Sequence, residues 1–149
     1  MEYDDFCKFY SDFQICYFHD RHKYSALHIT NAEKNKNIFL QFEIRKRGKY
    51  YFSLNQMNKR FFEKSKRYRY SNLSYIVSRR NKSGEAEYVG SQMKADKENW
   101  IGEDCEPGLY TVMIKPNWKS FVREFSFSVY GPETCKIQRV RLTFKYFYQ

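Results

Sequence analysis

The sequence predicts an all-β protein, an antiparallel β-sandwich of about eight strands with a short helical segment at its N-terminus. Three observations predict this fold class. Apolar and polar residues alternate with a period of two in several runs, 20% of the residues are aromatic, and turn-forming residues separate the runs. Strands that each carry one apolar face bury those faces against one another, and two stacked antiparallel sheets are the usual arrangement.

The individual elements follow from these patterns. Near the N-terminus, Tyr3, Phe6 and either Phe9 or Tyr10 line one side of a short helix. Strands are predicted at residues 13–18, 38–44, 50–54, 73–77, 109–114, 125–129 and 140–146. The polar turn at residues 46–49 predicts a hairpin, and turn residues also occur at 81–84, 106–108 and 131–132.

Composition limits the class of protein. A chain of 149 residues has room for one ordinary domain, and no apolar run is long enough to cross a membrane. The N-terminus lacks the basic-then-apolar order of a secretory signal, and none of the four cysteines, at 7, 16, 105 and 135, forms a C-x-x-C pair. We therefore expect free thiols and a cytoplasmic location.

The positive charge is concentrated in one quarter of the chain. The net charge is +10, and residues 45–82 contain 13 Lys and Arg against the single acid Glu63. Within this segment, cations alternate with Phe61, Phe62, Tyr68 and Tyr70, and the candidate anion-binding residues are Lys59, Arg60, Lys64, Lys66, Arg67 and Arg69. This pattern is compatible with nucleic acid, with anionic lipid, with the acidic surface of another domain, or with a solvated loop between strands.

Other chemistry has weaker signals. A candidate calcium-binding loop contains Asp96, Glu98, Glu103, Asp104 and Glu106, although solvated acids explain the same pattern. The C-x2-H-x2-H spacing of Cys16, His19 and His22 is poor for zinc on a strand, where residues three apart face opposite sides. No small-residue loop flanks Cys7 or Cys16, so a self-contained thiol enzyme is not expected. Apart from the candidate calcium loop, no metal or other cofactor is assigned.

Two stretches resemble the calpain-type cysteine protease family. The run MEYDDFCKFY at residues 1–10, followed by FQIC at 13–16, resembles the end of the family's protease core. The run EPGLYTVMIKP at 106–116, followed by FSFSVY at 125–130, resembles its C-terminal β-sandwich domain, also known as domain III. The order and spacing of these motifs cover nearly the whole chain.

The resemblance implies that residues 1–18 are a remnant of the protease core and that residues 19–149 form a C2-like β-sandwich domain. The family's catalytic Cys, His and Asn precede the Met-aromatic-Asp-Phe segment, so no catalytic residue is assigned to this chain. The implied function is non-catalytic and regulatory in proteolysis. In this function the basic segment docks either to a calpain-like protease core or to anionic phospholipid. The protease core belongs to the same longer chain or to a separate one. A basic nucleic-acid-binding module is the alternative from composition alone.

Overall fold

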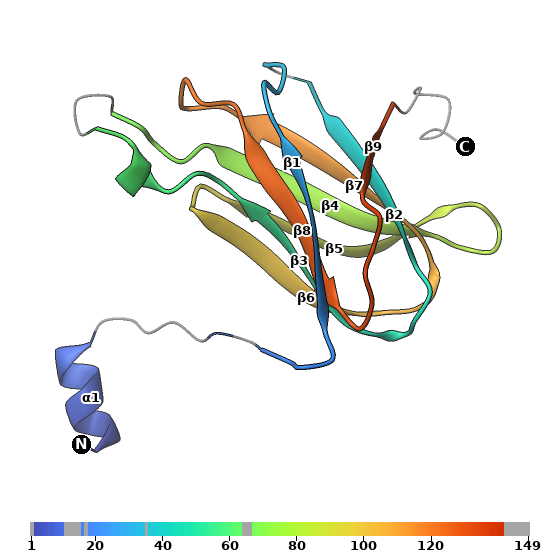
Figure 1. Ribbon diagram of the computed structural model, residues 1–149, viewed down its shortest axis with the longest axis horizontal. Helices are drawn as coiled ribbons and strands as arrows, with labels where there is room; N and C mark the ends of the chain where they lie inside the picture. The colour runs from blue at the N-terminus through green and yellow to red at the C-terminus, as the bar shows by residue number, and fades with distance from the viewer. Residues whose placement is uncertain (1, 11–15, 17, 35, 64–66, 142–149) are drawn as a thin grey trace.

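The computed structural model describes residues 2–10, 16, 18–34, 36–63 and 67–141. These residues form two antiparallel sheets and one short α-helix, which confirms the predicted β-sandwich (Figure 1). The helix is α1 (Tyr3–Phe9). The strands are β1 (Lys23–Ile29), β2 (Ile38–Ile44), β3 (Gly48–Asn55), β4 (Asn72–Arg80), β5 (Ala86–Lys94), β6 (Glu98–Cys105), β7 (Gly108–Asn117), β8 (Phe125–Gly131) and β9 (Gln138–Val140).

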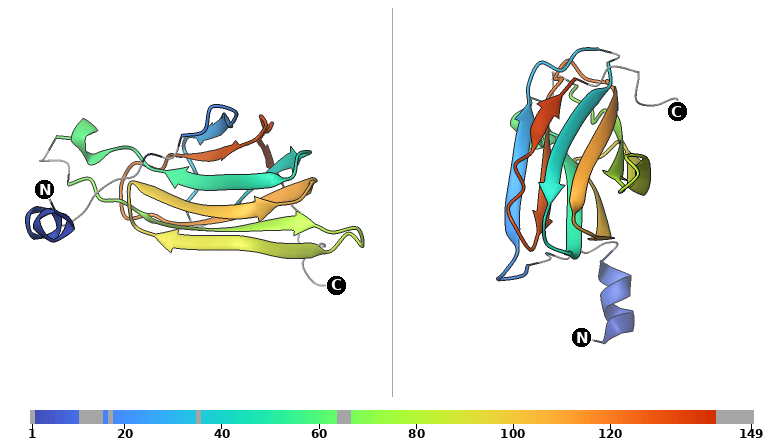
Figure 2. Two further views of the ribbon diagram at one scale, coloured as in Figure 1. Left: turned by 90° about the horizontal axis from the view of Figure 1, so that it is seen from below. Right: turned by 90° about the vertical axis from the view of Figure 1, so that its right-hand side faces the viewer.

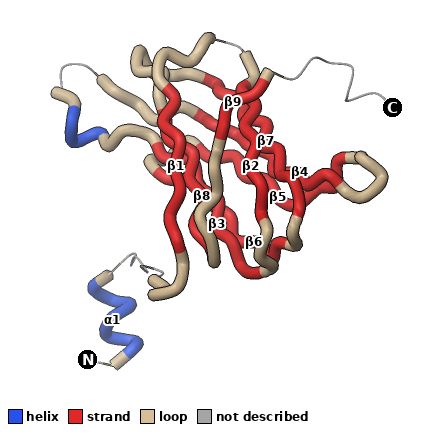
Figure 3. The backbone as a smooth tube through the Cα atoms, turned by 45° about the vertical axis from the view of Figure 1, so that its right-hand side comes forward, coloured by secondary structure: helices blue, strands red, loops and turns tan. Residues whose placement is uncertain are grey.

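The two sheets lie face to face (Figure 2). Sheet A has the strand order β1-β8-β3-β6, and sheet B has the order β5-β4-β7-β2-β9. Most successive strands lie in different sheets, which is the topology of a jelly roll with β9 added at the edge of sheet B. In consequence, the loops between strands gather at the two ends of the sandwich (Figure 3).

The core forms because the inward positions of both sheets are apolar. In β2, Ile38, Leu40, Phe42 and Ile44 are at most 2% exposed, which confirms the alternation seen in the sequence. In β8, Phe125, Phe127 and Val129 are buried in the same way, and they meet the residues of β2 across the gap between the sheets. Burial of such side chains contributes about 1.5–3 kcal/mol each.

The predicted hairpin at residues 46–49 is wrong. Strand β2 pairs with β7 and β9 in sheet B, whereas β3 pairs with β6 and β8 in sheet A. The turn between β2 and β3 therefore connects the two sheets. The turn at 81–84 does join paired strands, because β4 and β5 are neighbours and the Asn81 backbone N–H donates to the carbonyl of Glu85 at 2.9 Å.

Three strands, β1, β5 and β6, were not predicted from the sequence. In β5 and β6, apolar residues do not alternate regularly with polar ones, because few positions are buried. Strand β5 has one fully buried residue, Gly90, and β6 has two. The predicted strand at 140–146 has one described strand residue, Val140 at the end of β9, and residues 142–149 lie outside the described residues. Most of the strand predicted at 13–18 also lies outside them; Cys16 and Phe18 are described and lie in no strand.

The N-terminal helix is confirmed as α1. Its first turn contains Asp4 and Asp5, its last turn contains Lys8, and this arrangement is favourable for the helix dipole. None of its residues is buried, and Tyr3 and Phe9 are 79% and 77% exposed. No helix among the described residues combines the length and the apolar character needed to cross a bilayer.

Candidate functional site

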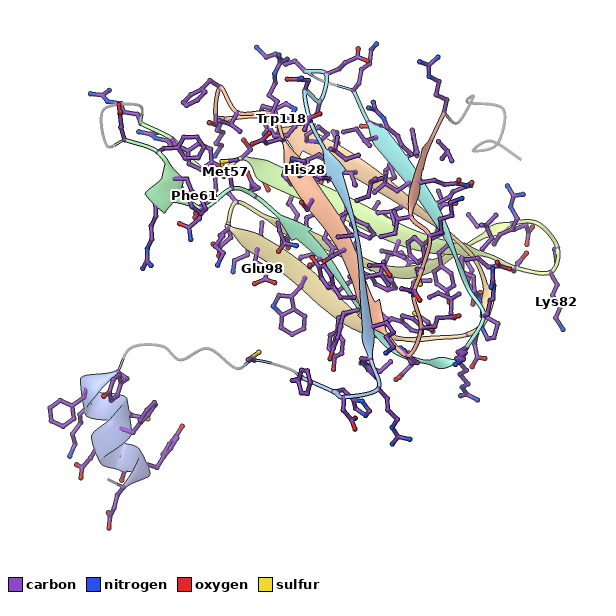
Figure 4. The ribbon with its side chains drawn as sticks, in the orientation of Figure 1. His28, Met57, Phe61, Lys82, Glu98 and Trp118 are labelled. Atoms are coloured by element: carbon purple, nitrogen blue, oxygen red, sulfur yellow. The ribbon has the colours of Figure 1, made fainter. Side chains whose placement is uncertain are left out.

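The basic segment at residues 45–82 does not form one surface. The chain passes along β3 from one end of the sandwich to the other and returns along β4. The cations of the segment are therefore divided between the two ends. Figure 4 shows this separation, with Phe61 and Met57 at one end and Lys82 in the hairpin at the other.

At the end that contains Lys82, most of the cations are neutralised by carboxylates. The ion pairs there are Arg45–Glu43 at 3.0 Å, Arg47–Glu106 at 2.9 Å, Lys49–Asp104 at 3.9 Å and Arg79–Glu87 at 2.6 Å. In addition, the Glu133 carboxylate accepts hydrogen bonds from the backbone N–H groups of Arg45 and Lys46 at 2.6 and 2.7 Å. Among the described residues, Lys46, Arg80 and Lys82 at this end form no ion pair, so the neutralisation is partial.

At the opposite end, Lys94 pairs with Asp96 at 2.9 Å, but seven other cations have no carboxylate partner. We call this surface the basic end, and it consists of Lys59, Arg60, Arg67 and Arg69 in the β3–β4 loop, Lys97 in the β5–β6 turn, and Lys119 and Arg123 in the β7–β8 loop. All seven side chains are exposed, and no ion pair forms at any of them within the described part of the chain. Lys64 and Lys66 lie outside the described residues.

A buried amide holds the loops of the basic end together. The Gln56 side chain, 8% exposed, donates to the carbonyls of Ser71 and Asp96 at 2.8 and 2.9 Å and accepts from the Ser71 backbone N–H at 2.9 Å. The Ser71 hydroxyl in turn accepts from the backbone N–H of Lys119 at 3.0 Å. These bonds join the two ends of the β3–β4 loop to the β5–β6 turn and to the start of the β7–β8 loop.

Aromatic rings of the same loops also pack on one another. Phe62 stacks on Tyr68 at 4.1 Å between ring centroids and meets Phe121 of the β7–β8 loop edge-on at 5.9 Å. The Lys59 ammonium lies 4.5 Å from the centroid of the Tyr70 ring. Burial of Tyr68, and then the neighbouring Tyr70, raises the pKa of the Tyr68 hydroxyl. Phe62, Tyr68 and Tyr70 are therefore engaged with groups of this chain.

Two other rings project from the same loops into solvent. Phe61 is 78% exposed and Phe121 is 62% exposed. Because water solvates such rings poorly, two largely exposed rings on adjacent loops are typical of a surface that contacts another phase or molecule. The basic end thus combines unpaired cations with exposed apolar rings.

Sequence reasoning identified only part of this site. It identified Lys59, Arg60, Arg67 and Arg69, and it missed Lys97, Lys119 and Arg123, which lie 28 to 54 positions further along the chain than Arg69. It also missed Gln56 and Ser71. No local signal identifies any of these residues, since their contribution depends on which loops share an end of the sandwich.

The candidate calcium-binding residues do not form a loop. Glu98, Glu103 and Asp104 lie in β6, with Asp96 before the strand and Glu106 after it, so the loop predicted here is wrong. An eight-residue strand is about 25 Å long, so Asp96 and Glu106 lie at opposite ends of the sandwich. Asp96 also pairs with Lys94 at 2.9 Å. Within the described residues, no group of three or more His, Cys, Asp or Glu side chains is placed to hold a metal ion.

The thiols divide into two kinds. Cys105 and Cys135 are buried, and burial raises the pKa of each to about 11. Cys7 and Cys16 are exposed.

Two histidines of the N-terminal region lie against each other. The rings of His19 and His22 stack with 4.4 Å between their centroids. Burial of His22 lowers its pKa most, and the neighbouring His19 lowers it further.

Comparisons with known proteins add one weak structural likeness. No protein-family model and no curated protein matches the chain. Among solved structures, the chain is similar to the crystal structure of GEBA250068378 from Sulfurospirillum deleyianum, with a TM-score of 0.47 and 9% sequence identity over 73% of this chain and 97% of that one. A likeness of this degree carries no functional argument, so the function is argued from the basic end and from the sequence motifs.

Proposed function

We propose that the chain is a non-catalytic, regulatory β-sandwich domain of a calpain-like cysteine protease, and that its basic end docks to anionic phospholipid. The sequence motifs at residues 1–16 and 106–130 support the family. The observation that carries the docking function is the contrast between the two ends of the sandwich. Four cations are paired with carboxylates at one end, whereas the seven cations of the basic end lack such partners among the described residues.

Unpaired cations favour an anionic partner because they approach it without first losing a carboxylate contact. Each Lys or Arg close to an anionic leaflet adds about 1 kcal/mol to membrane binding. The seven described cations of the basic end project from three adjacent loops, and Gln56 and Ser71 hold these loops together. Little ordering of the loops is therefore needed when they bind.

The exposed rings favour lipid over the other anionic partners. Phe61 and Phe121 project beside the cations, and aromatic rings at such positions enter the boundary between headgroups and acyl chains. An acidic protein surface, such as that of a protease core, would satisfy the cations but would leave these rings without an apolar environment. Single-stranded nucleic acid stacks on several ring faces in succession, and Phe62 and Tyr68 already stack on each other, which leaves Phe61 and Phe121 for such contacts.

Vesicle sedimentation tests the docking function. The purified chain should bind vesicles of phosphatidylserine and phosphatidylcholine much more tightly than vesicles of phosphatidylcholine alone. The affinity should fall steeply between low and physiological salt, since exposed charges are screened beyond about 8 Å. Neutralising two cations with Arg60→Gln and Arg69→Gln should remove about 2 kcal/mol, which is about a 30-fold loss of affinity.

A matched control uses cations that have partners. The double variant Arg45→Gln, Arg47→Gln removes the same charge from the opposite end, where both side chains are exposed and paired. It should bind anionic vesicles like the unmodified chain. Equal binding to neutral and anionic vesicles, or equal losses in the two double variants, would refute the proposed orientation.

The family assignment has a separate test. The coding sequence immediately upstream of Met1 should encode a papain-like set of Cys, His and Asn in one reading frame. The purified chain alone should not hydrolyse a peptide substrate. Unaided hydrolysis would contradict the non-catalytic assignment without affecting the test of vesicle binding.

A further inference from the structure

A tight turn precedes β1 and is held against sheet A. The backbone N–H of His22 donates to the carbonyl of His19 at 3.0 Å, which closes the turn. The Tyr130 hydroxyl of β8 accepts from the backbone N–H of His19 at 2.8 Å and donates to its carbonyl at 3.2 Å. The His22 ring also meets the Tyr130 ring edge-on, with 5.1 Å between centroids. The turn is thus fixed at the start of β1, at the end of the sandwich opposite the basic end (Figure 1).

A pocket of about 550 Å³ lies beside this turn. It is lined by residues 19–23, by Lys46 of the β2–β3 turn and by Pro132, which follows β8. Pro132 packs closely on the start of β3, since a Cβ atom at Gly48 would come within 2.7 Å of its ring. Small-molecule sites usually have volumes of about 300–1,000 Å³. The pocket is therefore large enough for a small ligand.

The lining of the pocket carries an excess of positive charge. Arg21, Lys23 and Lys46 are exposed, and none of them forms an ion pair within the described part of the chain. Asp20 is the only acid among the described residues of the lining. Its carboxylate accepts from the backbone N–H of Arg21 at 2.9 Å and lies 3.3 Å from Nδ1 of His19. Three cations against one carboxylate leave a net charge of +2 when both imidazoles are neutral.

Glu133 follows Pro132 but does not belong to the lining. Its carboxylate accepts from the backbone N–H groups of Arg45 and Lys46 at 2.6 and 2.7 Å and from the Tyr50 hydroxyl at 3.2 Å. This carboxylate is therefore engaged in holding the β2–β3 turn, and it forms no ion pair with the Lys46 ammonium.

A buried ring nitrogen adds a further hydrogen-bonding group to the pocket. Nδ1 of His22 is buried, and it has no hydrogen-bond partner among the described residues. A buried polar atom without a partner is unfavourable, and the N–H tautomer of this nitrogen donates to an oxygen acceptor. A metal ion is a poor candidate for the partner, because the three neighbouring cations repel it and no described group of three or more His, Cys, Asp or Glu side chains is placed to hold one.

We propose that the pocket lined by Arg21, Lys23 and Lys46 binds the phosphate group of a small soluble phosphate monoester. Such a group carries about −1.5 to −2 charges near pH 7 and three acceptor oxygens, which complements a lining of net charge +2 whose cations only donate. A carboxylate ligand brings a single charge and leaves part of the positive charge uncompensated. A phosphodiester, as in nucleic acid or a simple phospholipid, also carries one charge per phosphate and fits the pocket less well.

This inference goes beyond the docking of the basic end and does not depend on it. Isothermal titration calorimetry of the full chain with glycerol 3-phosphate at low salt tests it. We expect saturable binding at one site per chain, and no binding of glycerol or acetate. Arg21→Gln and Lys46→Gln should each weaken binding about 10-fold, the loss expected for one charge-assisted hydrogen bond. Both side chains are exposed, so the variants should remain folded, and circular dichroism checks this.

Arg45→Gln is the matched control for Lys46→Gln. Arg45 is the neighbouring residue, is also exposed, pairs with Glu43 at 3.0 Å and does not line the pocket. Its replacement removes the same charge from the same turn and should leave glycerol 3-phosphate binding unchanged.

The basic end provides a second comparison. The double variant Arg60→Gln, Arg69→Gln should bind glycerol 3-phosphate like the unmodified chain, and Lys46→Gln should bind anionic vesicles like it. Three results would overturn the inference. These are absence of saturable binding, equal losses in Lys46→Gln and Arg45→Gln, and tighter binding of a phosphoserine peptide than of glycerol 3-phosphate, which would identify a phosphorylated protein as the ligand.

Discussion

Removal of the Gln56 amide should weaken both the sandwich and its basic end. Gln56→Leu keeps much of the side-chain volume and removes three hydrogen bonds, to the Ser71 carbonyl, the Asp96 carbonyl and the Ser71 N–H. A buried polar group left without a partner costs about 1–3 kcal/mol. Because the two carbonyls lie near loops that water reaches, we take the lower end of this range for each group. The sum is about 3 kcal/mol.

Urea denaturation followed by circular dichroism measures this loss. For a domain of this size, about 3 kcal/mol corresponds to a fall in Tm of about 10 °C. Gln138→Leu is the control, since Gln138 is an exposed glutamine on β9 and its loss should change the free energy of unfolding by less than about 0.5 kcal/mol. If Gln56→Leu costs as little as Gln138→Leu, the amide does not hold the loops and the argument fails.

The same substitution separates stability from function. At a temperature where Gln56→Leu is fully folded, its loops are no longer fixed, and part of the binding energy is spent on ordering them. We therefore expect weaker binding to anionic vesicles although no cation has changed. Unaltered vesicle binding by the folded variant would show that the arrangement of the loops is unimportant for docking.

Three further outcomes follow from the described residues. Gly131→Ala should cost about 3 kcal/mol in urea denaturation, because a Cβ there overlaps the buried ring of Tyr50; Gly84→Ala should cost about 1 kcal/mol, since the site is open and only its φ of +87° is unfavourable. The reasoning fails if the two costs are equal. Burial of Glu133 opposes ionisation, but the N–H groups of Lys46 and Arg45 outweigh it and lower the pKa of Glu133 below its ordinary value of 4.5. The carboxylate thus stabilises the fold at neutral pH, and this contribution is lost as the pH falls below about 4.5. Glu133→Gln should flatten this part of the stability profile, and an unchanged acid slope would contradict the assignment. At about pH 7 a thiol reagent should label Cys7 and Cys16 rapidly and Cys105 and Cys135 only after unfolding, since burial raises the pKa of the latter pair; equal rates for all four would disprove the difference.

The sequence predicts those strands whose two faces differ most. Strands β2 and β8 bury alternate apolar residues, and the period of two is therefore visible along the chain. Strand β6 is different, because its outward side carries Trp100 and its inward side carries the buried amide of Asn99. A local pattern cannot identify such a strand, since tertiary contacts determine its polarity. A local pattern also contains no information about which strands pair. The turn at 46–49 therefore predicts a hairpin, although β2 and β3 belong to different sheets.

The basic end was predicted in part for the same reason. The cations from Lys59 to Arg69 are close in sequence and were recognised as a group, whereas Lys119 joins them through the jelly-roll topology. Counting charges along the chain also predicts a single basic surface for residues 45–82. The structure shows that Arg47 and Arg79 pair with Glu106 and Glu87, which lie outside the segment or across the hairpin, so that the free cations are fewer at that end than at the basic end.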